Sequence, residues 1–198
     1  MKKEINEILE NLQLVPFTKG YRIEDFVCEI CEYSQYLHKD ALSFQEIGVS
    51  KTHLLINKKN ADVIAYMVLV NDSIKLSDAE KTQHNMDSIP FGAFPSLKIG
   101  KLAVDKKYQK EYKGIGSLMI EIARGISHDI NELGVACKFI TIDADVEHNP
   151  SVLDFYIKNG FKFNEKYNKK SKIQTVSMRL DIYHNENEKI EKRTGTEN

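Results

Sequence analysis

The sequence predicts a mixed α/β (α+β) domain, because helical and β-rich segments follow one another along most of its 198 residues. Residues 53–57 and 63–70 are apolar and rich in strand-forming types, whereas the apolar residues after Gly116 recur at helical spacing. Hydrophobic residues make up 41% of the chain and charged residues 29%. This composition is that of a globular protein with room for a substantial core.

The first 48 residues are expected to be mainly helical. Apolar residues at positions 5, 8, 9 and 12 predict a short amphipathic helix that ends before Pro16. Asp25 is expected to cap a second helix, and a third helical stretch is expected over residues 36–47, ending near Gly48.

The next segment is predicted to form a β-hairpin, with residues 58–62 as the polar turn. Residues 71–94 are polar and irregular, and a loop of this length is expected to be either a functional flap or a mobile insertion. Residues 97–104 form the next predicted strand.

Residues 101–117 join this strand to a helix through a lysine-rich loop that contains Gly114 and Gly116. The first turn of a helix carries unpaired N–H groups and positive dipole charge, and glycine lets phosphates approach the backbone. The loop therefore predicts an anion site, although a glycine-containing junction with solvated lysines would look the same. A dinucleotide fingerprint would need a glycine where Met119 stands, and the P-loop pattern is absent. Gly134 is the expected C-cap of the helix.

The remaining segments predict a strand over residues 138–144, a helix over 149–160 and closing strands over 161–163 and 175–182. The helix has Pro150 near its start and Gly160 just past its end. We expect residues 1–183 to form a single domain, and the charged residues 184–198 to be a disordered tail.

Composition also argues against several classes of protein. The net charge of −1 is unlike that of a protein that coats nucleic acid, and no apolar run approaches the length of a membrane span. Without a signal-peptide pattern, the protein is expected to be cytoplasmic. Cys28 and Cys31 have CxxC spacing, but no second such pair completes a four-ligand zinc site, so we expect two helical cysteines and no metal.

Three motifs in this order resemble those of the GNAT superfamily of acyl-CoA N-acyltransferases. They are Leu102-Ala-Val104, Lys113-Gly-Ile-Gly-Ser117, and Asn149 followed by Phe155-Tyr156 and Asn159-Gly-Phe161. The resemblance covers roughly residues 50–182. It implies a mostly antiparallel sheet flanked by helices, in which a central parallel strand pair splays apart to hold acyl-CoA.

The resemblance also implies roles for particular residues. The backbone of Leu102, Ala103 and Val104 would pair with pantetheine, and Asn149 would contact the cofactor arm. The remaining cofactor-binding residues would be the loop residues Tyr112, Lys113, Gly114, Ile115, Gly116 and Ser117. Tyr156 would protonate the departing sulfur, its alternative being a packed aromatic.

Two points depart from this pattern or stay open. Glu111 stands where the family usually has Gln or Arg, and Gln109 lies two residues further back, so the loop looks lengthened by two residues. The general base stays open among Asp143, Asp145, Glu147, His148 and a water-mediated route.

The implied activity is acetyl transfer from acetyl-CoA to a primary amine of a small molecule or protein. The front segment, through Phe26, Cys28 and residues 37–42, together with Asp143-Ala144, is similar to toxin-related GNAT proteins that modify the amino group of aminoacyl-tRNA. In that alternative Lys98, Lys101 and residues 166–172 would hold tRNA phosphates. A third alternative is a non-catalytic acyl-CoA-binding partner protein. The sequence leaves open a monomer or a homodimer.

Overall fold

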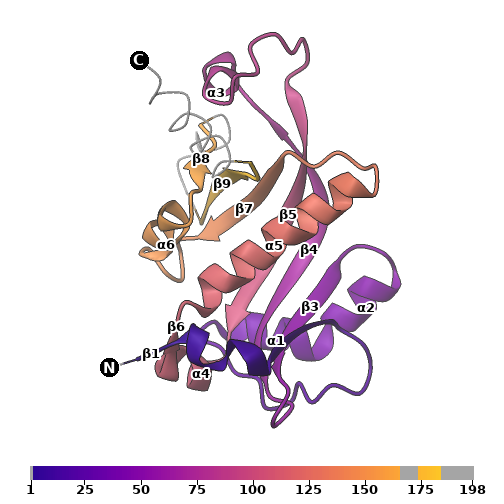
Figure 1. Cartoon of the computed structure of the whole chain (residues 1–198), viewed down its shortest axis with the longest axis vertical. Coiled ribbons are helices and arrows are strands. Elements are labelled where there is room, and N and C mark those ends of the chain that lie inside the picture. The colour runs from indigo at the N-terminus through magenta and orange to yellow at the C-terminus, as the bar shows by residue number, and fades with distance from the viewer. Residues whose placement is uncertain (1, 166–173, 184–198) are drawn as a thin grey trace. The chain divides into compact units, whose positions relative to one another are not determined.

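The structure, a computed structural model, describes residues 2–165 and 174–183 (Figure 1). The chain divides into two compact units, Met1–Asn71 with Ile99–Ile122, and Asp72–Lys98 with Ala123–Asn198. Three elements run from one unit into the other: β4 (Val63–Lys75), β5 (Ala93–Val104) and α5 (Ile115–Glu132). Strand order in the larger sheet is β2-β3-β4-β5-β7-β9-β8.

The first unit begins with β1 (Lys3–Glu4), the 3-10 helix η1 (Ile5–Asn11) and β2 (Leu12–Pro16). The helices α1 (Cys31–Lys39) and α2 (Ala41–Glu46) precede β3 (Lys51–Asn57). β3 pairs antiparallel with both β2 and β4, which confirms the predicted hairpin. Two short elements, α4 (Lys106–Glu111) and β6 (Tyr112–Lys113), follow β5.

The expectations for the front segment were wrong in two places. The predicted N-terminal helix is a 3-10 helix only to Asn11, because residues 12–16 pair with β3 and this tertiary pairing overrides local helical spacing. The second helix starts at Cys31 and not after Asp25. Phe26, only 2% exposed, instead enters the core from a turn and packs edge-on against Tyr66 at 5.4 Å between ring centroids.

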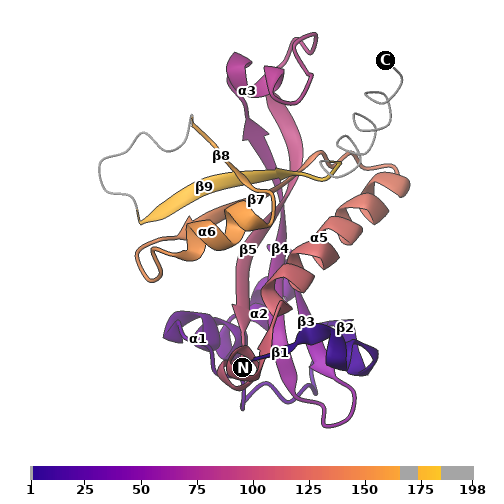
Figure 2. The same ribbon diagram turned by 60° about the vertical axis from the view of Figure 1, so that its left-hand side comes forward.

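The second unit contains α3 (Asp78–Thr82), β7 (Phe139–Asp145), α6 (Val152–Lys158), β8 (Lys162–Phe163) and β9 (Thr175–Asp181). β9 pairs antiparallel with β7 and β8. The first half of β5 runs parallel to β7. Lys138 N–H donates to Pro95 O (3.0 Å), and later residues of both strands also meet, since Lys98 pairs with Asp143 (2.7 Å). Figure 2 shows β5, β7 and β9 with α6 beside them.

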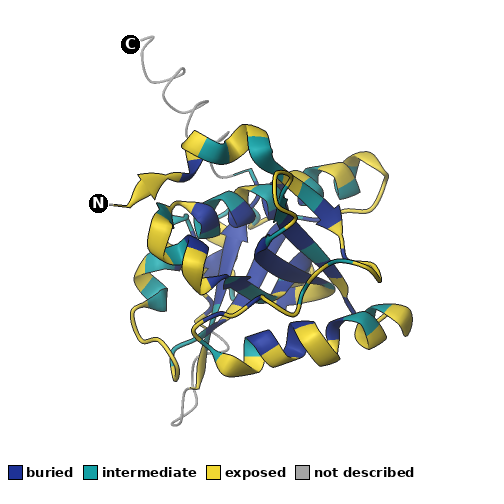
Figure 3. Ribbon diagram, turned by 90° about the horizontal axis from the view of Figure 1, so that it is seen from below, coloured by how far each residue is buried: buried dark blue, intermediate teal, exposed yellow. Residues whose placement is uncertain are grey.

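Residues 71–94 are more ordered than the sequence predicted. β4 continues to Lys75, and Ser77 caps α3 by a reciprocal arrangement with Glu80. The strands of the sheet are largely buried, whereas the helices keep an exposed face (Figure 3). The tail from residue 184 lies outside the described residues.

An unpredicted network of charged side chains ties α3 to β9 within this unit. Arg179, 1% exposed, donates from Nη1 to Glu80 (2.8 Å) and from Nε to His84 Nε2 (3.1 Å). His84 Nδ1 lies 3.0 Å from Asp181, which Lys138 also contacts at 2.9 Å. Because Nε2 of His84 accepts a hydrogen bond, its proton sits on Nδ1 and points at the carboxylate. Such buried charges are tolerated only when paired in this way.

Candidate cofactor site and catalytic residues

The stretch after β5 is a helix where the sequence predicted a lysine-rich loop. Asp105, 8% exposed, caps α4 by accepting from Lys107 N–H (2.9 Å), and its second oxygen accepts from Val27 N–H (3.0 Å). A capping carboxylate satisfies helix donors that would otherwise be unpaired. The expectation of an irregular loop was therefore wrong for Lys106–Glu111, and its lysines lie on a short helix.

Gly114 forms the turn into α5. Its φ of +93° lies in the left-handed region that favours glycine, and Ile115, 3% exposed, begins the helix. A Cβ at Gly114 would lie 3.1 Å from Cγ2 of Ile5, closer than side chains normally approach. The first turn of α5 thus follows a backbone that only glycine fits, and Gly114 itself is exposed.

The N-terminal segment lies against this glycine turn, which the sequence did not reveal. β1 and β6 pair in parallel with Lys3 opposite Tyr112 and Glu4 opposite Lys113. Glu4 forms an ion pair with Lys113, and Lys3 lies 3.2 Å from Glu111. The hydrogen bond to Glu111 raises the pKa of Lys3. Because these partners are more than 100 positions apart, no local pattern could have predicted them.

The other expected site residues of the first unit lie at the end of β5. Ala103 is buried in the core, whereas Leu102 and Val104 are half-buried. Glu111, which departs from the family pattern, is engaged by Lys3. The loop before Gly114, which looks two residues longer than the family pattern, thus contains α4 and the strand β6 that pairs with β1.

Tyr156 and Asn149 belong to the second unit. Tyr156 lies on α6, 6% exposed, between the rings of Phe155 and Phe161 at centroid distances of 5.0 and 5.3 Å. Asn149 precedes α6, and its Oδ1 accepts from Ser151 N–H (3.1 Å) and Oγ (2.7 Å). Both residues therefore have the structural role of holding this helix, whatever chemistry they add.

Several candidate bases and phosphate contacts already have partners. Asp143 pairs with Lys98, and Asp145 lies 2.9 Å from His148. Lys101 Nζ sits 4.5 Å from the ring centroid of Tyr33 and 5.1 Å from that of Tyr36. Glu147 is held through its main chain, whose N–H donates to Gln174 O (3.2 Å), and this bond does not involve its carboxylate. Residues 166–172, the remaining expected tRNA contact, lie outside the described residues.

The cysteine pair is not part of a metal centre in the described ranges, where no group of three or more His, Cys, Asp or Glu could hold a metal ion. Cys28 is buried with its thiol 3.3 Å from Ser34 Oγ, and it precedes α1. Cys31 is exposed at the first position of α1, so the expectation of two helical cysteines was right for Cys31 and wrong for Cys28. Within residues 2–165 and 174–183, no helix is long and apolar enough to cross a membrane.

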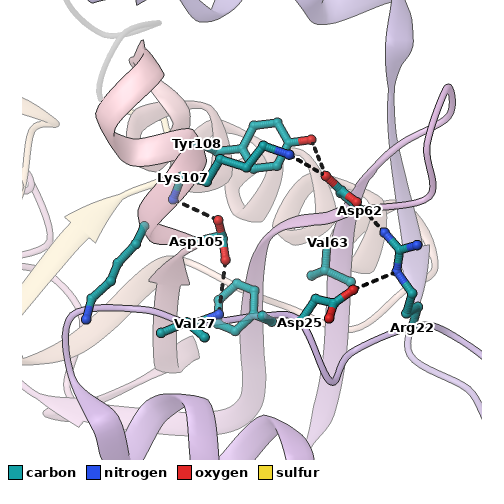
Figure 4. A pocket seen from close by; sticks show the side chains of 10 residues that line it. Arg22, Asp25, Val27, Asp62, Val63, Asp105, Lys107 and Tyr108 are labelled. Atoms are coloured by element: carbon teal, nitrogen blue, oxygen red, sulfur yellow. Dashed lines mark hydrogen bonds and ion pairs between the residues drawn. The ribbon is translucent and has the colours of Figure 1, made fainter.

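A cavity of about 400 Å³, which the sequence did not indicate, opens beside α4 (Figure 4). At its wall Asp62 accepts hydrogen bonds from Tyr108 Oη (2.8 Å) and Lys107 Nζ (3.0 Å), and it pairs with Arg22. Burial opposes ionisation of Asp62, but the bonds from Lys107 and Tyr108 outweigh it and lower its pKa. The wall has mixed charge, and residues 112–117 are not among its lining residues.

The fold is that of the GNAT acetyltransferases: a mostly antiparallel sheet with one parallel pair, flanked by helices. Neither a family model nor a curated protein matches the chain in sequence. Solved structures do match in fold, and they include bacterial toxins.

Among them is AtaT complexed with acetyl-methionyl-tRNAfMet, with a TM-score of 0.72 and 17% identity over 88% of this chain and 97% of that one. A tyrosine-to-phenylalanine mutant of AtaT bound to the C-terminus of the antitoxin AtaR gives 0.67, with 16% identity over 89% and 96%. AtaTR bound with AcCoA gives 0.68, with 18% identity over 90% and 98%. At these identities the matches establish the fold.

Proposed function

We propose that this protein is an acetyl-CoA-dependent N-acetyltransferase. The observation that carries the proposal is the left-handed turn at Gly114 after β5, which opens into the 18-residue helix α5 in the fold of the acetyltransferases. A structure of this fold, AtaTR, has been solved with AcCoA bound. An exposed glycine turn at the start of a long helix is suited to a pyrophosphate.

The residues present fit the cofactor. Backbone amides of Gly114, Ile115, Gly116 and Ser117 would take the pyrophosphate, and Tyr112 and Lys113 would flank it. Backbone groups of Leu102, Ala103 and Val104 would pair with the pantetheine, and Asn149 would contact the same arm. The proposal requires no metal.

In the transfer step the nitrogen of the amine bonds to the thioester carbonyl carbon and the carbon–sulfur bond breaks. Acetyl-CoA supplies this thioester when bound. Tyr156 would give its phenolic proton to the departing sulfur, a role supported by its buried position among aromatic rings. The ammonium proton would leave to water, because Asp143 and Asp145 at the end of β7 already pair with Lys98 and His148.

A second candidate function is acetyl transfer to the amino group of aminoacyl-tRNA. It is favoured because the fold match covers 97% of the AtaT chain, and that toxin was solved with acetyl-methionyl-tRNAfMet. The acceptor would then be cytoplasmic, and so would the enzyme. AtaT was also solved with the C-terminus of its antitoxin, so a protein partner of that kind belongs to this candidate.

Calorimetric titration with acetyl-CoA tests the proposal. We expect micromolar binding by the wild type and none by Gly114→Glu, which strains the turn and places a carboxylate among the phosphates. The matched control is Gly125→Glu, because Gly125 lies exposed on α5 with nothing within 4 Å of an added Cβ. Equal affinity in the wild type and Gly114→Glu would refute this placement of the cofactor.

A further inference from the structure

We propose that Glu4 is an affinity-determining residue of the cofactor site, because it holds Lys113 where a ligand phosphate would otherwise bind. This inference rests on the proposed function. β1 sets Glu4 opposite Lys113 in the β1–β6 register, and the two side chains form an ion pair. Lys113 is thus matched with a carboxylate at the site where the proposal places a phosphate.

The position of Glu4 is fixed by its neighbours in the chain. Ile5 is 7% exposed and its Cγ2 lies 3.1 Å from the position that a Cβ on Gly114 would take, so its side chain packs at the turn and anchors the segment there. On the other side, Lys3 pairs with Glu111 and lies 5.8 Å from the ring centroid of Tyr112. Glu4 is the N-cap of η1, and its N–H donates to Glu7 Oε1 (3.2 Å) in the first turn of that helix. The carboxylate of Glu4 therefore meets Lys113 as part of a built contact.

The ion pair is also open to exchange. The side chains of Glu4 and Lys113 are 55% and 59% exposed, so water and salt screen their attraction. A pyrophosphate brings more negative charge than one carboxylate, and it can also accept from the α5 amides. Lys113 would transfer from Glu4 to the phosphate on binding, and the lost ion pair would offset part of the gain.

Substitutions of Glu4 and of Ile5 should have separate effects, the first on affinity and the second on the exchange of the turn. Removing the charge of Glu4 frees Lys113 and raises acetyl-CoA affinity, by about twofold to fivefold for a pair this exposed. Shortening Ile5 loosens the segment from Gly114. Amides of residues 112–117 should then exchange faster with solvent in the ligand-free protein.

The test is calorimetry with acetyl-CoA and with acetyl-pantetheine, which lacks the phosphates, on the wild type, Glu4→Gln and Glu10→Gln. Glu10 is the matched control, since it is an exposed glutamate of the same N-terminal segment. We expect Glu4→Gln to bind acetyl-CoA about twofold to fivefold more tightly, with no change for acetyl-pantetheine and none for Glu10→Gln.

Three other outcomes would each contradict a different part of this inference. Equal or weaker acetyl-CoA binding by Glu4→Gln, with a wild type that binds, overturns the role of Glu4 and leaves the proposed function standing. A wild type and Glu4→Gln that both fail to bind acetyl-CoA overturn the proposed function and this inference with it. Unchanged exchange of residues 112–117 in ligand-free Ile5→Ala overturns the anchoring of the segment, independently of any ligand.

Discussion

At the scale of single residues, Tyr156 combines a packing role with the proposed chemical one. Its ring lies between Phe155 and Phe161, and these contacts do not involve the phenolic oxygen. A phenylalanine at this position keeps the ring and removes the proton. This substitution therefore tests the hydroxyl while the ring contacts stay in place.

We expect Tyr156→Phe to lower the rate of acetyl-CoA-dependent CoA release by about 10²- to 10⁴-fold, the usual value of a positioned proton donor. Acetyl-CoA affinity should stay within about twofold, because the Tyr156 hydroxyl is proposed to act in the transfer step and not to bind the phosphates. The measurement is thiol release with an amine acceptor, with Tyr183→Phe as the control. A rate equal to that of the wild type would remove Tyr156 from the mechanism.

Asp181 makes a pH-dependent contribution to stability. Burial opposes its ionisation, but hydrogen bonds from His84 and Lys138 outweigh this and lower its pKa to about 2. A carboxyl with a depressed pKa stabilises the folded state above its unfolded pKa, and this contribution is lost as pH falls toward the folded value.

We therefore expect Asp181→Asn to lower the free energy of unfolding by about 2 kcal/mol at pH 7, the equivalent of its pKa shift. The difference from the wild type should vanish between about pH 4 and pH 2. Denaturant unfolding across this pH range checks the expectation. A difference that stays constant down to pH 2 would show that the ionisation of Asp181 does not stabilise the fold.

At the scale of elements, the pair formed by Arg179 and Glu80 connects β9 to α3 within the second unit. Both side chains are 1% exposed, and Arg179 also donates to Phe163 O, Asn164 and Gln83. Glu80 accepts in addition from Glu165 N–H (3.1 Å). The helix α3 is thus held by charge as well as by its cap.

We expect Arg179→Met to destabilise the protein by about 3–5 kcal/mol, because it leaves the carboxylate of Glu80 buried without its partner. The double variant with Glu80→Gln should lose less than the sum of the two single variants. Thermal or denaturant unfolding of the four proteins measures this coupling. Additive losses would contradict a direct pairing.

Elements with strong local patterns were predictable from the sequence, and those set by distant partners were not. The periodicity after Gly116 located α5, and the β-rich runs located the β3–β4 hairpin. Residues 12–16 became a strand because β3 pairs with them, although the apolar spacing from Ile5 to Leu12 favoured a helix. Arg179 and Glu80 are 99 positions apart, so their pairing left no trace in either segment.

At the scale of the whole molecule, the net charge of −1 restricts how a tRNA could bind. Attraction to phosphates would have to come from local lysines and not from the overall field. The proposed cofactor site was expected from three motifs that follow one another along the chain. The pairing of β1 with β6 beside it was not expected. The sequence of residues 112–117 does not indicate that the N-terminal segment pairs with them, because this contact is set by the fold.

We expect the protein to transfer labelled acetyl from acetyl-CoA to aminoacyl-tRNA, if the second candidate is right. Association should weaken strongly between 50 and 200 mM salt, as phosphate contacts release counterions. Acid-precipitable label on charged tRNA measures the transfer, and deacylated tRNA is the control because it lacks the amino group. Label on neither tRNA, with a protein that binds acetyl-CoA, would return the acceptor to the small-molecule and protein amines.

We propose that acetyl-CoA binds at the end of β5 and the start of α5. Hydrogen exchange measured by mass spectrometry, with and without acetyl-CoA, tests this claim most directly. We expect the ligand to slow exchange of the amides of residues 102–104 and 113–117. Protection absent from residues 113–117, or confined to the segments around Arg22 and Asp62 that line the separate cavity, would contradict it.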